Sequence, residues 1–178
     1  MTASFRYRAV SAAVLLSAAL GGCAAFSGPE RACPRVAVLA NAERLVKFRP
    51  GEGRDLTDVL LTGRVQDVRY ECEYEDDVLT VTMLLQMLIN RGPANRDRQA
   101  EFQYFIGVVK MVDGEQHVMS KQVYNVRMAF EENSRTALIE GDRRATINLD
   151  PEELGTSYSL LVGFQLTRKE FDFIQSQR

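Results

Sequence analysis

The sequence contains no tryptophan and only one histidine, His117, in 178 residues. Histidine is the usual acid–base group near neutral pH and the commonest metal ligand. A hydrolase of the Ser-His-Asp or Cys-His type would therefore depend entirely on this one side chain. No cysteine or second histidine lies near it to share a metal. We expect no enzyme activity, no metal and no cofactor, and we interpret His117 as a solvated strand residue.

A strong net charge is also lacking. The chain has 22 Lys and Arg against 24 Asp and Glu, which gives a formal net charge of −2. Nucleic-acid binding rests on clustered basic side chains that neutralise phosphates, so the composition gives no reason to expect a nucleic acid as partner. The hydrophobic fraction of 46% and the charged fraction of 26% are typical of a globular protein.

The N-terminal segment has an apolar run that is too short to span a bilayer, which needs about 20 residues. Arg6 and Arg8 precede this run at 9–20, and Leu20-Gly21-Gly22-Cys23 follows it. A basic segment, an apolar segment and a small-residue site in this order are typical of a signal peptide. The last four residues resemble the lipobox of Gram-negative bacterial lipoproteins. This resemblance implies cleavage before Cys23, diacylglyceryl transfer to its thiolate, and a further acyl chain on the new amine.

The resemblance also predicts the domain organisation and the location. Residues 1–22 are the expected signal peptide, residues 23–32 a lipidated tether and residues 33–178 one folded domain. Ala24 stands where an aspartate retains many lipoproteins in the inner membrane, which implies the outer membrane with the domain facing the periplasm. The nine residues after Cys23 reach at most about 30 Å. The alternative is an ordinary signal peptide cut further along, with Cys23 incidental.

The three cysteines become an even number once Cys23 is set aside. Cys33 and Cys72 remain, and an even count in an oxidising compartment predicts a disulfide. The alternative is a pair of reduced thiols that are buried separately.

The hydrophobic pattern has a period of two, which is typical of β-strands. Val68, Tyr70, Cys72 and Tyr74 alternate with charged residues, and an apolar residue stands at every second position of 79–89, where a helix is the rival interpretation. Asp113-Gly114 predicts a tight hairpin. The expected strands begin near Val36 and Val38 and then cover 60–75, 79–89, 102–112, 116–130, 136–140, 145–149 and 158–166.

Two short helical segments are expected near the C-terminus. Asp150-Pro151 predicts one helical turn through Glu153, and Thr167 with Glu170 forms a capping box that opens a terminal helix. We expect this helix to cap the open edge of a sandwich, with partner binding as the alternative.

One segment resembles the stretch that leads into the sixth strand of fibronectin type III and related immunoglobulin-like domains. It is Leu154-Gly155-Thr156, followed by Tyr158, Leu160 and Val162. In those domains a tyrosine packs at the corner and bonds back to the backbone. The expected fold is therefore all-β: an antiparallel, immunoglobulin-like β-sandwich of about seven strands with a short C-terminal helix. A lipocalin-like or other small β-barrel is the alternative.

Two charged segments are candidate sites. Arg91, Arg96 and Arg98 share one loop, which could dock an acidic protein partner or lipid headgroups or be a solvated Gly-Pro turn. The acidic run over 71–77 lacks the glycine-containing calcium loop of an EF-hand. Alternation instead spreads its glutamates over one solvated face.

The functional expectation follows from location and fold. The chain resembles lipoproteins of Gram-negative envelopes that serve as accessory subunits of assembly or transport machines. This predicts a lipid-anchored, non-enzymatic structural or interaction module with an envelope-protein partner. The alternatives are a small-ligand or lipid carrier, which needs an apolar cavity of roughly 300 Å³ or more, and an envelope hydrolase.

Overall fold

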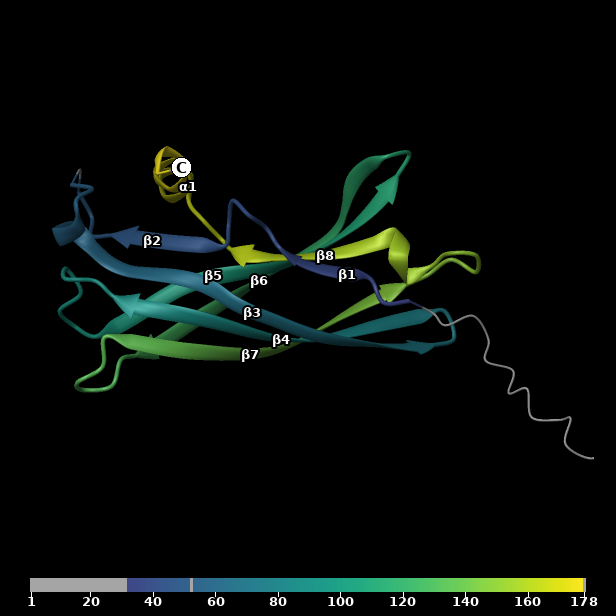
Figure 1. The fold of residues 1–178 in the computed structure, drawn as a ribbon, viewed down its shortest axis with the longest axis horizontal. Coiled ribbons are helices and arrows are strands. Elements are labelled where there is room, and N and C mark those ends of the chain that lie inside the picture. Colours follow the sequence, from purple (N-terminus) through teal and green to yellow (C-terminus); the bar gives the residue numbers. More distant parts are fainter. Residues whose placement is uncertain (1–31, 52, 178) are drawn as a thin grey trace, which may run out of the picture. The chain divides into compact units, whose positions relative to one another are not determined.

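The computed structural model describes residues 32–51 and 53–177, whose strands form two four-stranded sheets that stack as a β-sandwich (Figure 1). Sheet A has the order β1-β8-β5-β6, and sheet B has the order β2-β3-β4-β7. The strands are β1 (Arg35–Val38), β2 (Arg44–Phe48), β3 (Val59–Glu75), β4 (Val78–Arg91), β5 (Gln99–Val112), β6 (Glu115–Ala129), β7 (Thr136–Asn148) and β8 (Tyr158–Phe164). The predicted β-sandwich is confirmed, with eight strands instead of about seven.

Alternation along β4 places one continuous apolar row in the core. Each side chain of this row is at most 1% exposed: Leu79, Val81, Met83, Leu85, Met87 and Ile89. The opposite row, from Thr80 to Asn90, is half-buried. Such a period-two pattern stabilises a strand and not a helix, so the rival helical interpretation of 79–89 is wrong.

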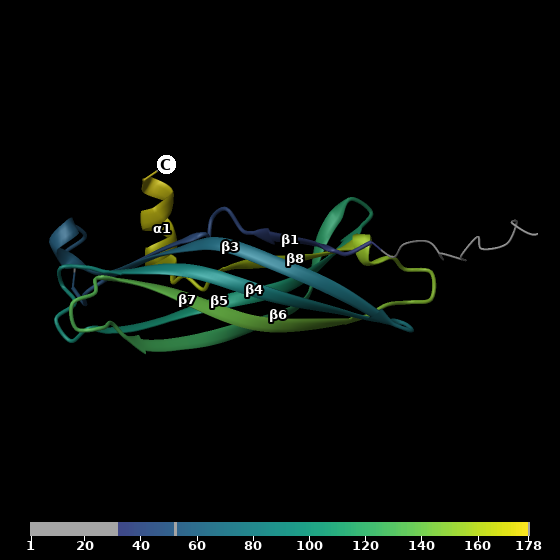
Figure 2. The ribbon, with the colours of Figure 1, turned by 60° about the horizontal axis from the view of Figure 1, so that its bottom comes forward.

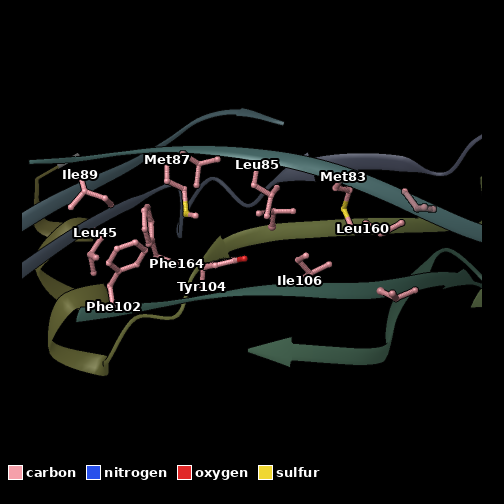
Figure 3. Close-up of a cluster of buried hydrophobic side chains, with 14 of the residues drawn as sticks. Leu45, Met83, Leu85, Met87, Ile89, Phe102, Tyr104, Ile106, Leu160 and Phe164 are labelled. Carbon is pink, nitrogen blue, oxygen red and sulfur yellow. The ribbon is translucent and has the colours of Figure 1, made fainter. Parts of the chain in front are cut away.

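Sheet A supplies the facing half of the core. Phe102 of β5 and Phe164 of β8 pack edge to face, with ring centroids 5.7 Å apart, and neither is more than 1% exposed. Figure 3 shows these rings opposite Leu45, Met87 and Ile89, with side chains of both layers pointing into the space between the sheets. These side chains belong to one cluster of buried residues that joins the two sheets.

The N-terminal end of the domain is fastened to β3. Cys33 and Cys72 form the predicted disulfide, with their Cα atoms 5.8 Å apart. The hydroxyl of Tyr74 donates a hydrogen bond to the carbonyl of Ala32 at 2.7 Å. Beyond the bridge, β1 adds to β8 in parallel, with Val36 opposite Leu160. It is the one parallel pairing among the described strands, whose other pairs are antiparallel as predicted.

The C-terminal helix α1 (Arg168–Ser176) begins at the predicted capping box, in which Thr167 and Glu170 exchange side-chain to backbone hydrogen bonds. Its Phe173 packs edge to face on Phe48 of β2, with ring centroids 4.8 Å apart. The helix therefore packs against β2, an edge strand of sheet B (Figure 1). No helix in the described part of the chain is both long and apolar enough to cross a membrane.

Three local predictions differ from the structure. The strands expected at 136–140 and 145–149 are one continuous strand, β7, because Gly141 pairs with Leu85 across the expected break. The expected helical turn is a hydrogen-bonded turn, in which the N–H of Glu153 donates to the carbonyl of Asp150 at 2.8 Å. A 3₁₀ turn, η2 (Gly155–Ser157), follows it. Strand β2 was not predicted, since it has only five residues and two of them are charged.

Tyr158 differs from the corner tyrosine that it resembles. Its hydroxyl donates to Oε2 of Glu153 at 2.7 Å and not to the backbone. Lys110 of β5 donates to the other oxygen of the same carboxylate, and the N–H of Asp150 donates to Oε2 at 3.2 Å. These bonds, the one from Lys110 foremost, lower the pKa of Glu153 from 4.5 to about 2. The immunoglobulin-like assignment stays a prediction.

This cluster predicts a pH dependence of stability. A carboxyl group with a lowered folded pKa contributes stability above its unfolded pKa of about 4.5 and loses it as the pH falls through about 2. The Glu153→Gln variant should therefore unfold at lower urea concentration than the wild type at pH 6, and the two midpoints should converge near pH 2. Glu152→Gln, at the exposed neighbour, is the control and should leave the midpoint unchanged. The prediction would be contradicted if the urea midpoints of wild type and Glu153→Gln differed by the same amount at every pH.

Candidate functional site

The three arginines of the predicted loop differ in exposure, and the predicted lipid site is not tested by the structure. Cys23 lies outside the described residues. In the loop, Arg96 and Arg98 are exposed, whereas Arg91 ends β4 and is half-buried. The buried Asn95 organises the loop, because its Nδ2 donates to the carbonyl of Gln99 and its Oδ1 accepts from the N–H of Arg98. Within the described residues, the side chains of Arg96 and Arg98 form no hydrogen bond or ion pair, so both guanidinium groups are open to a partner.

The other charged candidates are spread over exposed surface. His117 is exposed on β6, opposite Lys110 of β5. Glu71, Glu73 and Glu75 are exposed at alternate positions of β3, as the pattern predicted. Within residues 32–51 and 53–177, no three His, Cys, Asp or Glu side chains gather in a way that could hold a metal ion.

The β5–β6 hairpin carries the largest group of exposed apolar side chains. Asp113 and Gly114 form its tip, with φ angles of 52° and 84°, which confirms the predicted tight turn. The first nine residues of β6 are exposed on both faces, and Figures 1 and 2 show this part of the hairpin turned away from sheet B. The exposed apolar residues of the hairpin, each at least 40% exposed, are Met111, Val112, Val118, Met119 and Val123.

The outer edge of β6, the last strand of sheet A, has no neighbouring strand among the described residues. An edge strand presents unpaired N–H and C=O groups that can pair with another chain, and short length, charge or a covering helix normally prevents this. Strand β1 has four residues and β2 is covered by α1. Strand β7 carries charged side chains at Glu140 and 142–144. Strand β6 is long, and its stretch 122–126 contains no charged residue.

A cleft of about 290 Å³ opens between β6 and β7, where the hairpin leaves the sandwich. Its position follows from the inward-facing residues of β7, which are Ala137, Ile139, Gly141, Arg143, Ala145 and Ile147. Ala145 is too small to reach β6 and leaves the space open. The cleft is lined by Ile106, Val108, Ser120, Gln122, Tyr124, Arg144, Ala145 and Thr146.

Arg143 lies on the inward face of β7, one position before the lining residue Arg144. Its guanidinium lies 4.6 Å from the centroid of the Tyr124 ring and 5.7 Å from that of Tyr104. The two rings are cross-strand neighbours and stack, with centroids 5.0 Å apart. Stacking on aromatic faces is a favourable environment for arginine. In Figure 3, Tyr104 lies along the core between Phe164 and Ile106.

The polar groups of this corner are incompletely satisfied. The Nε atom of Arg143 and the hydroxyl of Tyr104 are buried and have no hydrogen-bond partner in the described part of the chain. One terminal nitrogen of Arg143 donates to the carbonyl of Asp142, but no described carboxylate forms an ion pair with it. Burial raises the pKa of Tyr104, and the positive charge of Arg143 opposes that rise.

No family model, curated protein or solved structure matches the chain. The function has to be inferred from the site itself.

Sequence reasoning missed both the open edge and the cleft. The apolar residues of β6 indicated a strand, but no local pattern shows which strand lies at an edge. Arg143 was read as part of a break between two strands. One signal could have shown that Arg143 faces the core. Ile139, Gly141, Ala145 and Ile147 are small or apolar residues at alternate positions, and Arg143 stands at the remaining position of the same face.

Proposed function

We propose that this protein is a lipid-anchored, non-enzymatic interaction module of the envelope, which binds an extended segment of another envelope protein along β6. The lipobox resemblance at Cys23 supports the anchor. The free edge of β6 supports the mode of binding, since a peptide can add a strand to such an edge through main-chain hydrogen bonds. The proposal assigns no chemical step to the protein.

The observation that carries the proposal is the exposure of apolar side chains on the long edge strand β6. Val118 is 70% exposed and Met119 56%. Neighbouring apolar side chains that are exposed together are typical of a protein-interaction surface. A partner strand with apolar side chains at alternate positions would cover them and pair with the backbone of β6. A β-bulge at Met119 lies between the pairs Val108–Ser120 and Val109–Val118. Because a bulge interrupts regular strand pairing, we expect the partner strand to pair with residues 120–129 and, separately, with residues 115–118.

Site-specific photo-crosslinking in intact cells tests the docking edge. A photoreactive amino acid at Val118 or Val123 should give an adduct that is heavier than the chain by the mass of a distinct envelope protein. The same probe at Asp142, which is exposed on the charged edge strand β7, is the matched control and should give none. Val123→Lys should lower the adduct yield from Val118 at least about tenfold, because a charge would have to be buried in the paired edge.

Two outcomes would contradict this proposal. Equal adducts from Val118 and Asp142 would show that β6 is not a preferred surface, and an adduct of twice the chain mass would show self-association instead. The anchor is checked on the same preparation by mass spectrometry of the N-terminal peptide. We expect it to begin at Cys23 and to carry acyl chains, whereas an unmodified N-terminus further along would exclude lipidation.

A carrier function remains as the second candidate, and one observation favours it. The cleft beside β7 has a volume of about 290 Å³, close to the lower limit for small-ligand pockets.

A further inference from the structure

We infer that the segment of the envelope partner that adds to β6 is an acidic strand, with a carboxylate beside Lys121 and apolar side chains beside the stretch 122–126. This inference rests on the docking role proposed above for the β6 edge. It goes further by assigning the chemistry of the partner strand and by disfavouring a second copy of this chain as the partner.

All of the formal charge on the docking part of β6 is positive. Residues 116–129 contain Lys121 and Arg127 and no aspartate or glutamate. Opposite charges on neighbouring strands stabilise their pairing, and like charges destabilise it. The acidic residues of the edge strand β7, Glu140 and Asp142, alternate with its inward row and lie on the outer face of sheet B. The edge of β6 therefore selects a strand of negative charge.

Lys121 is the charged residue of β6 for which the fold supplies no counter-ion among the described residues. Arg127 forms an ion pair at 3.0 Å with Glu101, its cross-strand neighbour on β5. The neighbour of Lys121 on β5 is Gly107, which has no side chain, and none of the ion pairs between described residues includes Lys121. Its Nζ lies 4.5 Å from the centroid of the Phe105 ring. A carboxylate on an added strand would pair with Lys121 as Glu101 pairs with Arg127.

The uncharged stretch 122–126 specifies the rest of the partner strand. Val123 lies on the outer face with Lys121 and is 41% exposed. Tyr124 and Val126 lie on the inner face, where they are half-buried against the core. Apolar side chains on both faces of an added strand would remove the remaining surface of these residues from water. The expected partner segment is therefore apolar, with an acidic residue at the end beside Lys121.

A second copy of this chain fits the edge poorly. Two β6 strands could pair antiparallel about a two-fold axis at Tyr124, the centre of the uncharged stretch. Such a symmetric interface would place Lys121 of each copy opposite Arg127 of the other. Like charges directly opposite one another destabilise a strand pair, and this contact would occur twice.

Photo-crosslinking from Val118 in intact cells, with single changes at Lys121, tests the inference. Lys121→Glu should lower the yield of the adduct with the partner at least about tenfold, because the partner's carboxylate would face a like charge. Lys121→Arg keeps the charge and should preserve most of the yield. Lys169→Glu, at an exposed position of α1, is the matched charge reversal and should leave the yield unchanged.

A second variant separates the charge from the packing of Lys121 on Phe105. Lys121→Met keeps an apolar side chain over the ring and loses only the charge, so it should lower the yield about threefold, as expected for one lost cross-strand ion pair. Far-ultraviolet circular dichroism and urea unfolding of the purified variants show that each has kept the wild-type fold.

The adduct also identifies the partner segment directly. Tandem mass spectrometry of the adduct formed from Val123 should locate the crosslink in an apolar segment, within about four residues of an aspartate or glutamate, since opposite and diagonal neighbours are in reach. Replacing that acid in the partner by lysine should restore the adduct in chains that carry Lys121→Glu.

The outcomes separate this inference from the docking proposal. An undiminished adduct in folded Lys121→Glu and Lys121→Met chains, or a crosslinked segment without an acidic residue, would overturn the acidic strand and leave the docking edge standing. The absence of any adduct in the wild-type chain, or an adduct of twice the chain mass, would overturn both.

Discussion

Replacement of both Cys33 and Cys72 by serine is expected to lower the free energy of unfolding by about 4 kcal/mol. The bridge joins residues 39 positions apart, and in the chain-entropy model a loop of this length removes much of the freedom of the unfolded chain. Urea unfolding followed by far-ultraviolet circular dichroism and by tyrosine fluorescence measures the loss, since the chain has no tryptophan.

Reduction provides the matched control for this prediction. Wild-type protein kept in dithiothreitol should unfold at nearly the same urea concentration as the double serine variant, and the variant should not respond to dithiothreitol. If the oxidised wild type and the variant unfold together, the bridge contributes nothing to stability. Hydrogen exchange should also show faster exchange in β1, because only four residue pairs hold it on β8 once the bridge is gone.

The local features of the fold could be predicted from the sequence because their causes are local. The alternation in β4 reports directly which side chains face the core. Asp113-Gly114 specifies its turn through two residues with positive φ, and Thr167 with Glu170 specifies the start of α1. The disulfide could be predicted because only two cysteines remain once Cys23 is assigned to lipidation.

The features that make up the candidate site could not be predicted, because they depend on which strands meet. Strand β4 pairs with β7, and β5 pairs with β8, across long stretches of sequence. These pairings alone decide that β6 is an edge. They also decide that Ala145 faces Ser120 and Gln122 over an open space.

Arg143 illustrates the limit most clearly. A charged residue between two apolar strands is typical of a turn, and the sequence was interpreted in this way. In the structure the Tyr104–Tyr124 pair provides a surface on which the guanidinium can lie inside the edge of the sandwich. The two tyrosines are about 20 and 40 residues away from Arg143 along the chain. The contacts that allow an arginine within a continuous β7 are therefore non-local.

Truncation of Phe102 to alanine is expected to lower the free energy of unfolding by about 3–5 kcal/mol, the range measured for large aromatic residues in cores. The Phe102 side chain is fully buried and packs edge to face on Phe164. Its loss removes apolar burial and leaves a cavity between the sheets, which the rigid strands on either side cannot close. Urea unfolding at constant disulfide state measures the effect.

Phe105→Ala is the matched control, because it deletes the same atoms three positions further along β5. Phe105 is half-buried on the other face, where Lys121 covers its ring at 4.5 Å. Less apolar surface returns to water there and no cavity forms in the core, so we expect less than half of the Phe102 effect. Equal losses from the two variants would mean that the inner face of β5 does not carry the core. In that case the placement of Ile106 and Val108 beside the cleft would fail with it, since all three side chains lie on the same face of one strand.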